Sequence, residues 1–124
     1  MTRMIRKLIY PELSYKITGV LFQIHNELGR YCKEKQYQEA IENLLKQAGL
    51  RFEREKKIPI SPEIGGNQVD FLIEDKILLE CKAKPFITKD DYYQILRYLK
   101  ASKKKLGLLV NFRNRYLKPK RIAN

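Results

Sequence analysis

The sequence predicts an α/β (α+β) fold in which a mixed β-sheet is flanked by helices, with the elements in the order ααβββαβ. Three features predict this class. Apolar residues recur at helical spacing up to residue 48, the spacing becomes that of strands between residues 51 and 83, and a further helical pattern precedes the apolar run LGLLVNF (106–112). The 124 residues suit one domain, and we expect residues 1–124 to form it, with a basic tail from about residue 113.

Three helices are expected. Ser14 can cap the first, which ends at Gly29, and the second runs from about Glu34 to Ala48. Thr88 can cap the third, which continues through about Ser102. Their apolar stripes are Ile17, Val20, Leu21, Ile24 and Leu28, then Tyr37, Ala40, Ile41, Leu44, Leu45 and Ala48, then Tyr92, Ile95, Leu96 and Leu99.

Four strands are expected, at residues 51–60, 67–73, 77–83 and 106–112. The segment SPEIGGN (61–67) is the first turn region, and EDK (74–76) is the second. Of the two registers that we considered for the hairpin 67–83, a three-residue turn gathers its apolar side chains on one face, whereas a two-residue turn mixes charged and apolar residues on both. That apolar face comprises Val69, Phe71, Ile73, Ile77, Leu79, Cys81 and Ala83.

The same register places charged residues together on the other face of the hairpin. Asp70 lies opposite Glu80, Gln68 lies opposite Lys82, and Leu72 and Leu78 complete the face. Directly opposed like charges destabilise a sheet, so something must offset the repulsion between the two carboxylates. A Mg²⁺ ion can do so, because it binds one or two carboxylates together with waters and phosphate oxygens. A solvated sheet face with a Glu–Lys ion pair accounts for the spacing equally well.

The charge of the chain favours a polyanionic partner. Lysine and arginine number 26 against 14 aspartate and glutamate, a formal net charge of +12. Such an excess favours nucleic acid over a membrane surface, since neutralised phosphates release counterions. Much of the charge lies in KASKKK (100–105) and RNRYLKPKR (113–121), which could equally be a solvated helix end and a frayed terminus. The expected phosphate-binding residues are Lys100, Lys103, Lys104, Lys105, Arg113 and Arg115.

Cysteine usage and hydropathy indicate a cytoplasmic protein. Cys32 and Cys81 lack the spacing of a metal site, and the N-terminus MTRMIRKLIYPELS lacks the apolar run and cleavage site of a signal peptide. No segment approaches the roughly 18 consecutive apolar residues of a membrane span.

Asp70 followed by ECK (80–82) resembles the motif of the PD-(D/E)XK nuclease superfamily. From roughly Ile17 to Ile122 the chain is similar to the small GxxExxY proteins of that superfamily. Three blocks carry this resemblance in order: IHNELGRYCKEKQYQEAI (24–41), VDFLIEDKILLECKA (69–83) and YYQILRYLKASKKKLGLLVNF (92–112). Glu34 and Tyr37 hold their places in the signature, whereas Tyr31 stands where it opens with glycine. Gln68 and Val69 stand where a basic residue and a proline are expected.

The resemblance implies a restriction-endonuclease-like PD-(D/E)XK core and a metal-dependent phosphodiesterase. Asp70 and Glu80 would hold Mg²⁺ or Mn²⁺ together with the backbone carbonyl of Cys81. Lys82 would orient the attacking water or stabilise charge on the phosphorane, and Glu34 would complete the acidic cluster. Helix-terminal charge alone would also explain a glutamate at the start of a helix.

Further candidates carry weaker signals. Gln94 and Tyr98 have the Gln-x-x-x-Tyr spacing of RecB-type nucleases, yet Gln94 points away from the expected core stripe. A solvent-exposed glutamine and a flanking tyrosine explain them as well. His25, the only histidine, is more often a packed or capping group at such a place than a metal ligand.

We therefore expect a Mg²⁺-dependent nuclease acting on DNA or RNA. The alternatives are a non-catalytic nucleic-acid-binding module with the same fold and a regulatory subunit that binds a partner protein. A homodimer is an open expectation for so small a nuclease.

Overall fold

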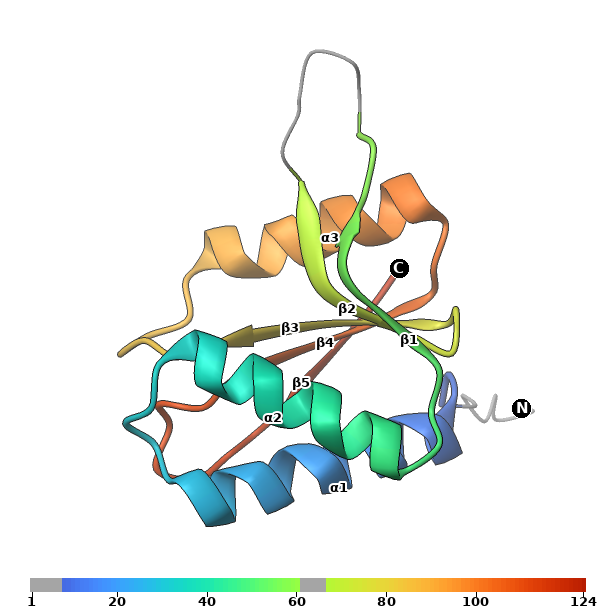
Figure 1. Cartoon of the computed structure of the whole chain (residues 1–124). Coiled ribbons are helices and arrows are strands. Elements are labelled where there is room, and N and C mark those ends of the chain that lie inside the picture. Colours follow the sequence, from blue (N-terminus) through green and yellow to red (C-terminus); the bar gives the residue numbers. More distant parts are fainter. Residues whose placement is uncertain (1–7, 61–66) are drawn as a thin grey trace, which may run out of the picture.

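The computed structural model describes residues 8–60 and 67–124, which form one mixed sheet between two helical layers (Figure 1). The sheet has five strands in the order β1-β2-β3-β4-β5. Helices α1 and α2 cover one face and α3 covers the other (Figure 1). This confirms the predicted class, an α+β fold consistent with a PD-(D/E)XK nuclease-like core. The expected turn region 61–67 lies outside the described residues except for Asn67, as do the first seven residues.

Helix α1 spans Pro11–Leu28, and α2 spans Glu34–Gln47. The second matches the sequence prediction closely, but the predicted cap at Ser14 is wrong. The helix begins one turn earlier because Pro11 has a backbone angle suited to the first helical position. Ser14 is instead buried inside the helix, where its hydroxyl donates to the carbonyl oxygen of Pro11 at 3.2 Å.

Helix α3 spans Lys89–Ser102 and has the predicted cap. The Thr88 hydroxyl accepts from the backbone N–H of Asp91 at 3.3 Å, and the Asp91 carboxylate accepts from the backbone N–H of Thr88 at 2.8 Å. The buried side of α3 is rotated slightly from the predicted stripe. Its buried residues are Asp91, Ile95, Tyr98 and Leu99, whereas Tyr92 and Leu96 are only partly buried.

The strands are β1 Phe52–Lys57, β2 Gln68–Ile73, β3 Ile77–Lys82, β4 Leu106–Asn111 and β5 Lys120–Ala123. Neighbouring strands are antiparallel except for β3 and β4, which are parallel and joined through α3. The first four lie where the sequence predicts them. The expected basic tail also contains β5, whose Ile122 is buried between exposed neighbours.

The β2–β3 hairpin has the predicted three-residue turn. Phe71 pairs with Leu79, and Ile73 pairs with Ile77. Glu74 and Asp75 have positive φ angles of 53° and 55°, a conformation that costs a non-glycine residue about 1–2 kcal/mol. Contacts offset this cost: the Glu74 N–H donates to the Arg51 carbonyl, the Glu74 carboxylate accepts from the Arg51 N–H, and Asp75 pairs with Lys104 at 2.9 Å.

The predicted register stops short of the charged residues. The β2–β3 ladder ends at Phe71 and Leu79, because β1 and β2 curve away from the other strands and towards α3 (Figure 1). Two predictions therefore fail. Gln68 pairs with Lys57 of β1, with no ladder pairing to Lys82, and Val69 packs in the α3 cluster instead of joining Phe71 on the α1–α2 face.

Two apolar clusters hold the layers together. Helices α1 and α2 pack on the sheet through residues that include Ile17, Tyr37, Phe71 and Phe112. Helix α3 packs on the opposite face against Leu72, Leu78 and Ile122. Among the residues that the structure describes, none of the helices combines the length and apolar character needed to cross a membrane.

Candidate metal and phosphodiester site

Asp70 and Glu80 face each other where β2 separates from β3, and we call them the carboxylate pair. The backbone N–H of Asp70 donates to Glu80 Oε1 at 2.7 Å, and the backbone N–H of Cys81 donates to Asp70 Oδ2 at 2.8 Å. Each side chain thus satisfies a backbone donor on the other strand that the ladder has left. The structure brings the two predicted carboxylates together without a ladder pairing between them.

The Cys81 backbone points towards the same gap. Its N–H donates to Asp70 on the β2 side, whereas the carbonyl of Lys82 accepts from the backbone N–H of Phe112 after β4 at 2.8 Å. The N–H and C=O of one strand residue point the same way, and successive residues alternate. The Cys81 carbonyl therefore faces β2 and the carboxylate pair, while its thiol is buried in the α1–α2 cluster.

Burial makes both carboxylates hard to ionise. Glu80 is 4% exposed, and its pKa is raised to about 8 by burial and then by the charge of Asp70. Burial also raises the pKa of Asp70, against the lowering effect of its hydrogen bond from Cys81. The charge of Asp70 thus disfavours ionisation of Glu80, and a proton on Glu80 at neutral pH relieves the repulsion between the pair in the absence of a cation.

Lys82 follows on the same strand, and its Nζ lies 3.6 Å from Glu80 Oε2. Burial lowers the pKa of this ammonium, but Glu80 and Glu34 outweigh burial, so the pKa is raised. The lysine is thus a charged hydrogen-bond donor beside the carboxylate pair. Because its pKa is raised, it does not act as a base at neutral pH.

Glu34 and Tyr37 come from the start of α2. Burial, followed by the charge of Asp70, raises the pKa of Glu34, which places it in the field of the carboxylate pair. Tyr37 has a structural position: its hydroxyl donates to the Gly29 carbonyl at 2.6 Å, and its ring stacks on Phe112 at 4.2 Å. It thereby fixes the loop that leads into α2.

The sequence did not indicate Gln38, which contacts Asp70, or Arg54, which contacts Gln38. Gln38 donates from Nε2 to Asp70 Oδ1 at 3.2 Å, and Arg54 of β1 lies 3.5 Å from the Gln38 amide oxygen and 3.7 Å from Glu42. Helical spacing could have found Gln38 and Glu42, because they follow Glu34 by one and two turns on the same side of α2. Arg54 carries no comparable signal, since every residue of β1 after Phe52 is charged.

The other candidate residues, His25, Tyr98 and Gln94, lie on two different helices. His25 Nε2 lies 2.8 Å from the Asn114 carbonyl oxygen, so it links α1 to the loop after β4. Tyr98 is buried in the α3 cluster, and burial and then Glu80 raise its pKa, which puts the tyrosine near the carboxylate pair. Gln94 is only partly buried on the same helix. Also near the site, Lys84 pairs with Asp91 at 2.6 Å.

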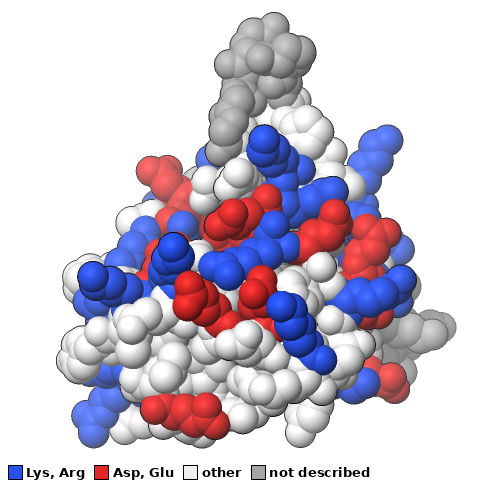
Figure 2. Space-filling model, in the orientation of Figure 1, with Lys and Arg blue, Asp and Glu red and all other residues white. Residues whose placement is uncertain are grey.

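The basic residues divide between the two ends of the parallel strands. Lys103, Lys104 and Lys105 precede β4, whose first residue pairs with Ile77, so they lie at the end of β3 away from Lys82. Lys100 is exposed on the last turn of α3. Arg113 and Arg115 follow β4 at the end where Lys82 pairs with Asn111. On the face shown in Figure 2, Lys and Arg side chains are interspersed with Asp and Glu and form no exclusively basic surface.

The donor set fits Mg²⁺ chemically, although the side chains do not form a coordination shell as they stand. Within residues 8–60 and 67–124, no three His, Cys, Asp or Glu side chains lie in an arrangement that could hold a metal ion. Two carboxylates and the Cys81 carbonyl are nevertheless the oxygen donors that Mg²⁺ prefers. The raised pKa values of the carboxylate pair indicate that positive charge would be favoured between them.

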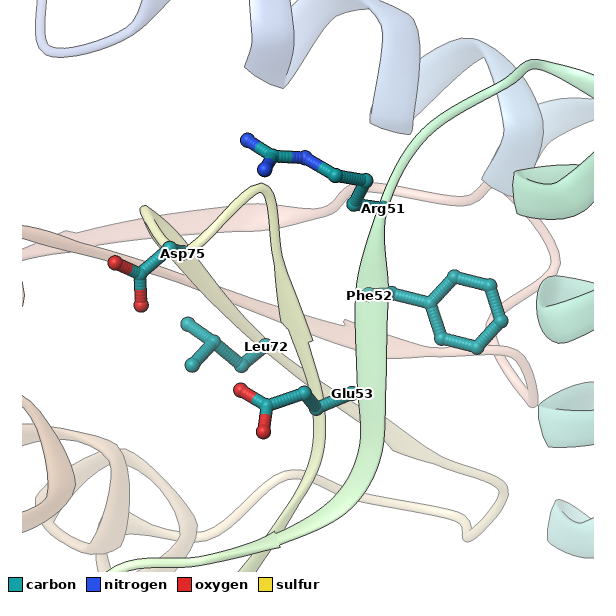
Figure 3. Close-up of a pocket in the computed structure, with 5 residues that line it drawn as sticks. All are labelled: Arg51, Phe52, Glu53, Leu72 and Asp75. Carbon is teal, nitrogen blue, oxygen red and sulfur yellow. The ribbon is translucent and has the colours of Figure 1, made fainter.

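A hollow of about 310 Å³ lies elsewhere, beside the β2–β3 turn (Figure 3). It is lined by Arg51, Phe52, Glu53, Leu72 and Asp75, and the Phe52 ring points away from Leu72 and Asp75 (Figure 3). None of the predicted site residues lines it, so this hollow is not the candidate site.

Comparison with known proteins agrees with this geometry. The family model described as "PD-(D/E)XK nuclease superfamily" matches residues 11–122, which include every element from α1 to most of β5. No curated protein and no solved structure gives a significant match. Because the match covers nearly the whole chain and includes the carboxylate pair and Lys82, this chain belongs to the PD-(D/E)XK nuclease superfamily.

Proposed function

We propose that this protein is a Mg²⁺-dependent or Mn²⁺-dependent nuclease that hydrolyses phosphodiester bonds in DNA or RNA. One observation carries the proposal: Asp70 and Glu80 are held face to face with Lys82 beside them, in a chain of this superfamily. Burying two opposed carboxylates costs stability, and a protein that only binds nucleic acid has no need of that cost.

Each residue of the site has a role in this proposal. Asp70, Glu80 and the Cys81 carbonyl would hold the cation, which when bound would supply Lewis-acid polarisation of the scissile phosphate and a lowered pKa for a water molecule. The charged Lys82 donates hydrogen bonds to the attacking water or to the phosphoryl oxygens as negative charge develops. The contact of its Nζ with Glu80 Oε2 at 3.6 Å keeps the ammonium at the site before substrate binds.

Glu34 extends the acidic site from the α2 side. Its raised pKa and its proximity to Asp70 and Lys82 support a part in binding a second cation or in orienting Lys82. The spacing of Glu34 and Tyr37 also supports placing the chain among the GxxExxY proteins, with Tyr31 in place of the glycine.

Lys82→Ala tests the chemistry apart from binding. We expect single-turnover cleavage with Mg²⁺ to slow by on the order of a hundredfold or more, because one preorganised contact to the developing charge is lost. Affinity for the same oligonucleotide in Ca²⁺ should change little, since Lys82 is not a cation ligand. Glu34→Gln should show a smaller loss of rate.

The control for Lys82→Ala is Lys76→Ala, which removes the same charge at the turn end of the same hairpin. It should cleave at the parent rate. If Lys82→Ala cleaves as fast as the parent, the proposed mechanism is wrong. If the parent binds nucleic acid but cleaves neither DNA nor RNA with Mg²⁺ or Mn²⁺, the protein is a binding module. If it does not bind nucleic acid, a role as a protein-binding subunit takes precedence.

A further inference from the structure

The loop between α1 and α2 presents an aromatic side chain beside two guanidinium groups. Tyr31 is 75% exposed, and the guanidinium carbons of Arg30 and Arg113 lie 5.0 Å and 5.6 Å from the centroid of its ring. We call these three residues the Arg–Tyr cluster. Because the ring is largely in solvent, packing in the core does not account for its position.

The cluster is held in place by its own hydrogen bonds. Arg30 Nε donates to the carbonyl of Arg113 at 2.8 Å, and Arg113 Nε donates to the carbonyl of Arg30 at 3.1 Å. Arg113 Nη2 also donates to the carbonyl of Ala83 at 3.3 Å. These reciprocal bonds fix two long side chains that are otherwise mobile on a surface, so a ligand would meet a preorganised site.

The positive charge of the cluster is not neutralised. Within residues 8–60 and 67–124, neither Arg30 nor Arg113 forms an ion pair with a carboxylate, and the terminal amino groups of Arg30 have no hydrogen-bond partner. A guanidinium with free amino groups can bind a phosphate through two parallel hydrogen bonds. The cluster therefore suits an anion that also offers a flat apolar face.

The cluster adjoins the candidate site. Ala83, whose carbonyl Arg113 binds, directly follows Lys82 on the chain, and Tyr31 precedes Glu34 by three residues. Consecutive Cα atoms are about 3.8 Å apart, so the contact at Ala83 lies within one or two residue lengths of Lys82. A nucleotide next to a phosphate bound at Lys82 can reach the cluster.

We propose that the Arg–Tyr cluster binds an unpaired nucleotide of the substrate strand, with Arg30 on its phosphate and the base stacked on the Tyr31 ring or an adjacent guanidinium plane. This inference rests on the proposed function and specifies its substrate as single-stranded or locally unpaired nucleic acid. In a duplex the faces of each base are covered by its neighbours, so only an unpaired base offers a face to Tyr31. Stacking on aromatic side chains is the usual way in which proteins hold such bases.

Fluorescence anisotropy on the full-length chain tests the proposal. The probes are a short fluorescein-labelled strand of DNA or RNA and the same strand in a duplex, with Ca²⁺ in place of Mg²⁺ to prevent cleavage. Tyr31→Ala should weaken binding of the single strand roughly tenfold and leave duplex binding within about twofold, whereas Tyr31→Phe should bind like the parent. Arg30→Gln should lower the salt dependence of single-strand binding by about one counterion.

The matched control is Tyr15→Ala, which removes another exposed tyrosine near the opposite end of α1. It should bind as the parent does. Three results would each overturn the inference. Tyr31→Ala could bind the single strand as the parent does, or it could lose the same affinity for the single strand and the duplex. The third is that the parent binds polyglutamate as tightly as it binds the single strand. This inference and the proposed function can fail separately. If the protein binds single strands through Tyr31 but never cleaves them with Mg²⁺, only the proposed nuclease activity is refuted. If the protein cleaves nucleic acid and its cleavage does not depend on Tyr31, only the role of the Arg–Tyr cluster is refuted.

Discussion

The carboxyl group of Glu80 shows how the site balances stability against function. In the absence of a cation its pKa of about 8 means that folding holds a proton on this group at neutral pH. Asp70 keeps its hydrogen bond from the Cys81 backbone in the same state. Cation binding must displace the Glu80 proton, so affinity for Mg²⁺ should rise with pH up to about 8.

Glu80→Gln should remove the part of the pH dependence of stability that comes from this carboxyl group. Folding raises the pKa of Glu80 from its ordinary 4.5 to about 8, so its contribution is full below the lower value and is lost as pH rises through the upper one. In EDTA the parent should lose up to about 1.4 kcal/mol of unfolding free energy per pH unit in this window relative to the variant. Urea unfolding between about pH 5 and pH 8 measures it.

Glu39→Gln, at an exposed position on α2, is the control for this measurement and should follow the parent. Saturating Mg²⁺ should reduce the difference between the parent and Glu80→Gln, because the cation replaces the proton. Parallel pH profiles for the two proteins in EDTA would contradict the buried, proton-holding carboxyl group.

At the scale of elements, the sequence predicted the hairpin register because only one of the two turn lengths considered separates apolar from charged residues. It could not predict where that register ends, since the curvature of β1 and β2 comes from their packing over α3. The prediction that Val69 shares the face of Phe71 is therefore wrong. Strand β5 has four residues and one buried side chain, Ile122, too little alternation to reveal a strand.

The candidate site, like the hairpin, was predictable only in part. Asp70, Glu80 and Lys82 follow from the register and the motif, and Glu34 follows from the resemblance. Their hydrogen-bond partners do not, because Gln38 is an ordinary polar residue of a helix until its contact with β2 is known. The residues that hydrogen-bond to the site residues are set by contacts between segments that are distant in the sequence, and no local pattern in the chain encodes such contacts.

Gln38→Ala should weaken the site without unfolding the protein. The amide is the link between α2 and the Asp70 carboxylate, and loss of a partner that orients a metal ligand typically costs 10–100-fold in affinity. We expect the midpoint of Mg²⁺ binding, measured by calorimetric titration, to shift by about tenfold. Asn43→Ala, an exposed amide on the same helix, should bind Mg²⁺ like the parent. Equal affinity in both variants would show that Gln38 does not orient Asp70.

At the scale of the whole molecule, basic residues that contribute to the net charge of +12 lie at both ends of the parallel strands β3 and β4. Arg113 lies beside the candidate site, whereas Lys103, Lys104 and Lys105 lie at the opposite end of β3 and β4. The Lys104 ammonium also pairs with Asp75 at 2.9 Å, which leaves Lys103 and Lys105 as the cations available to a phosphate backbone. We therefore expect the charge excess to contribute general attraction for nucleic acid more than contact at the site.

Replacing Lys103, Lys104 and Lys105 together by glutamine should separate these roles. Each phosphate contact contributes about 0.7–0.9 to the slope of log affinity against log salt, so loss of two contacts should lower the slope on long nucleic acid by about 1.4–1.8. The cleavage rate at saturating enzyme should stay within about twofold of the parent, because these lysines lie away from Lys82. Binding isotherms at several salt concentrations and single-turnover rates measure the two quantities, with the triple arginine variant as the control that keeps the charge. An unchanged slope would exclude these lysines from the nucleic-acid surface, and a large loss of rate would place them closer to the reacting phosphate than the β3–β4 register does.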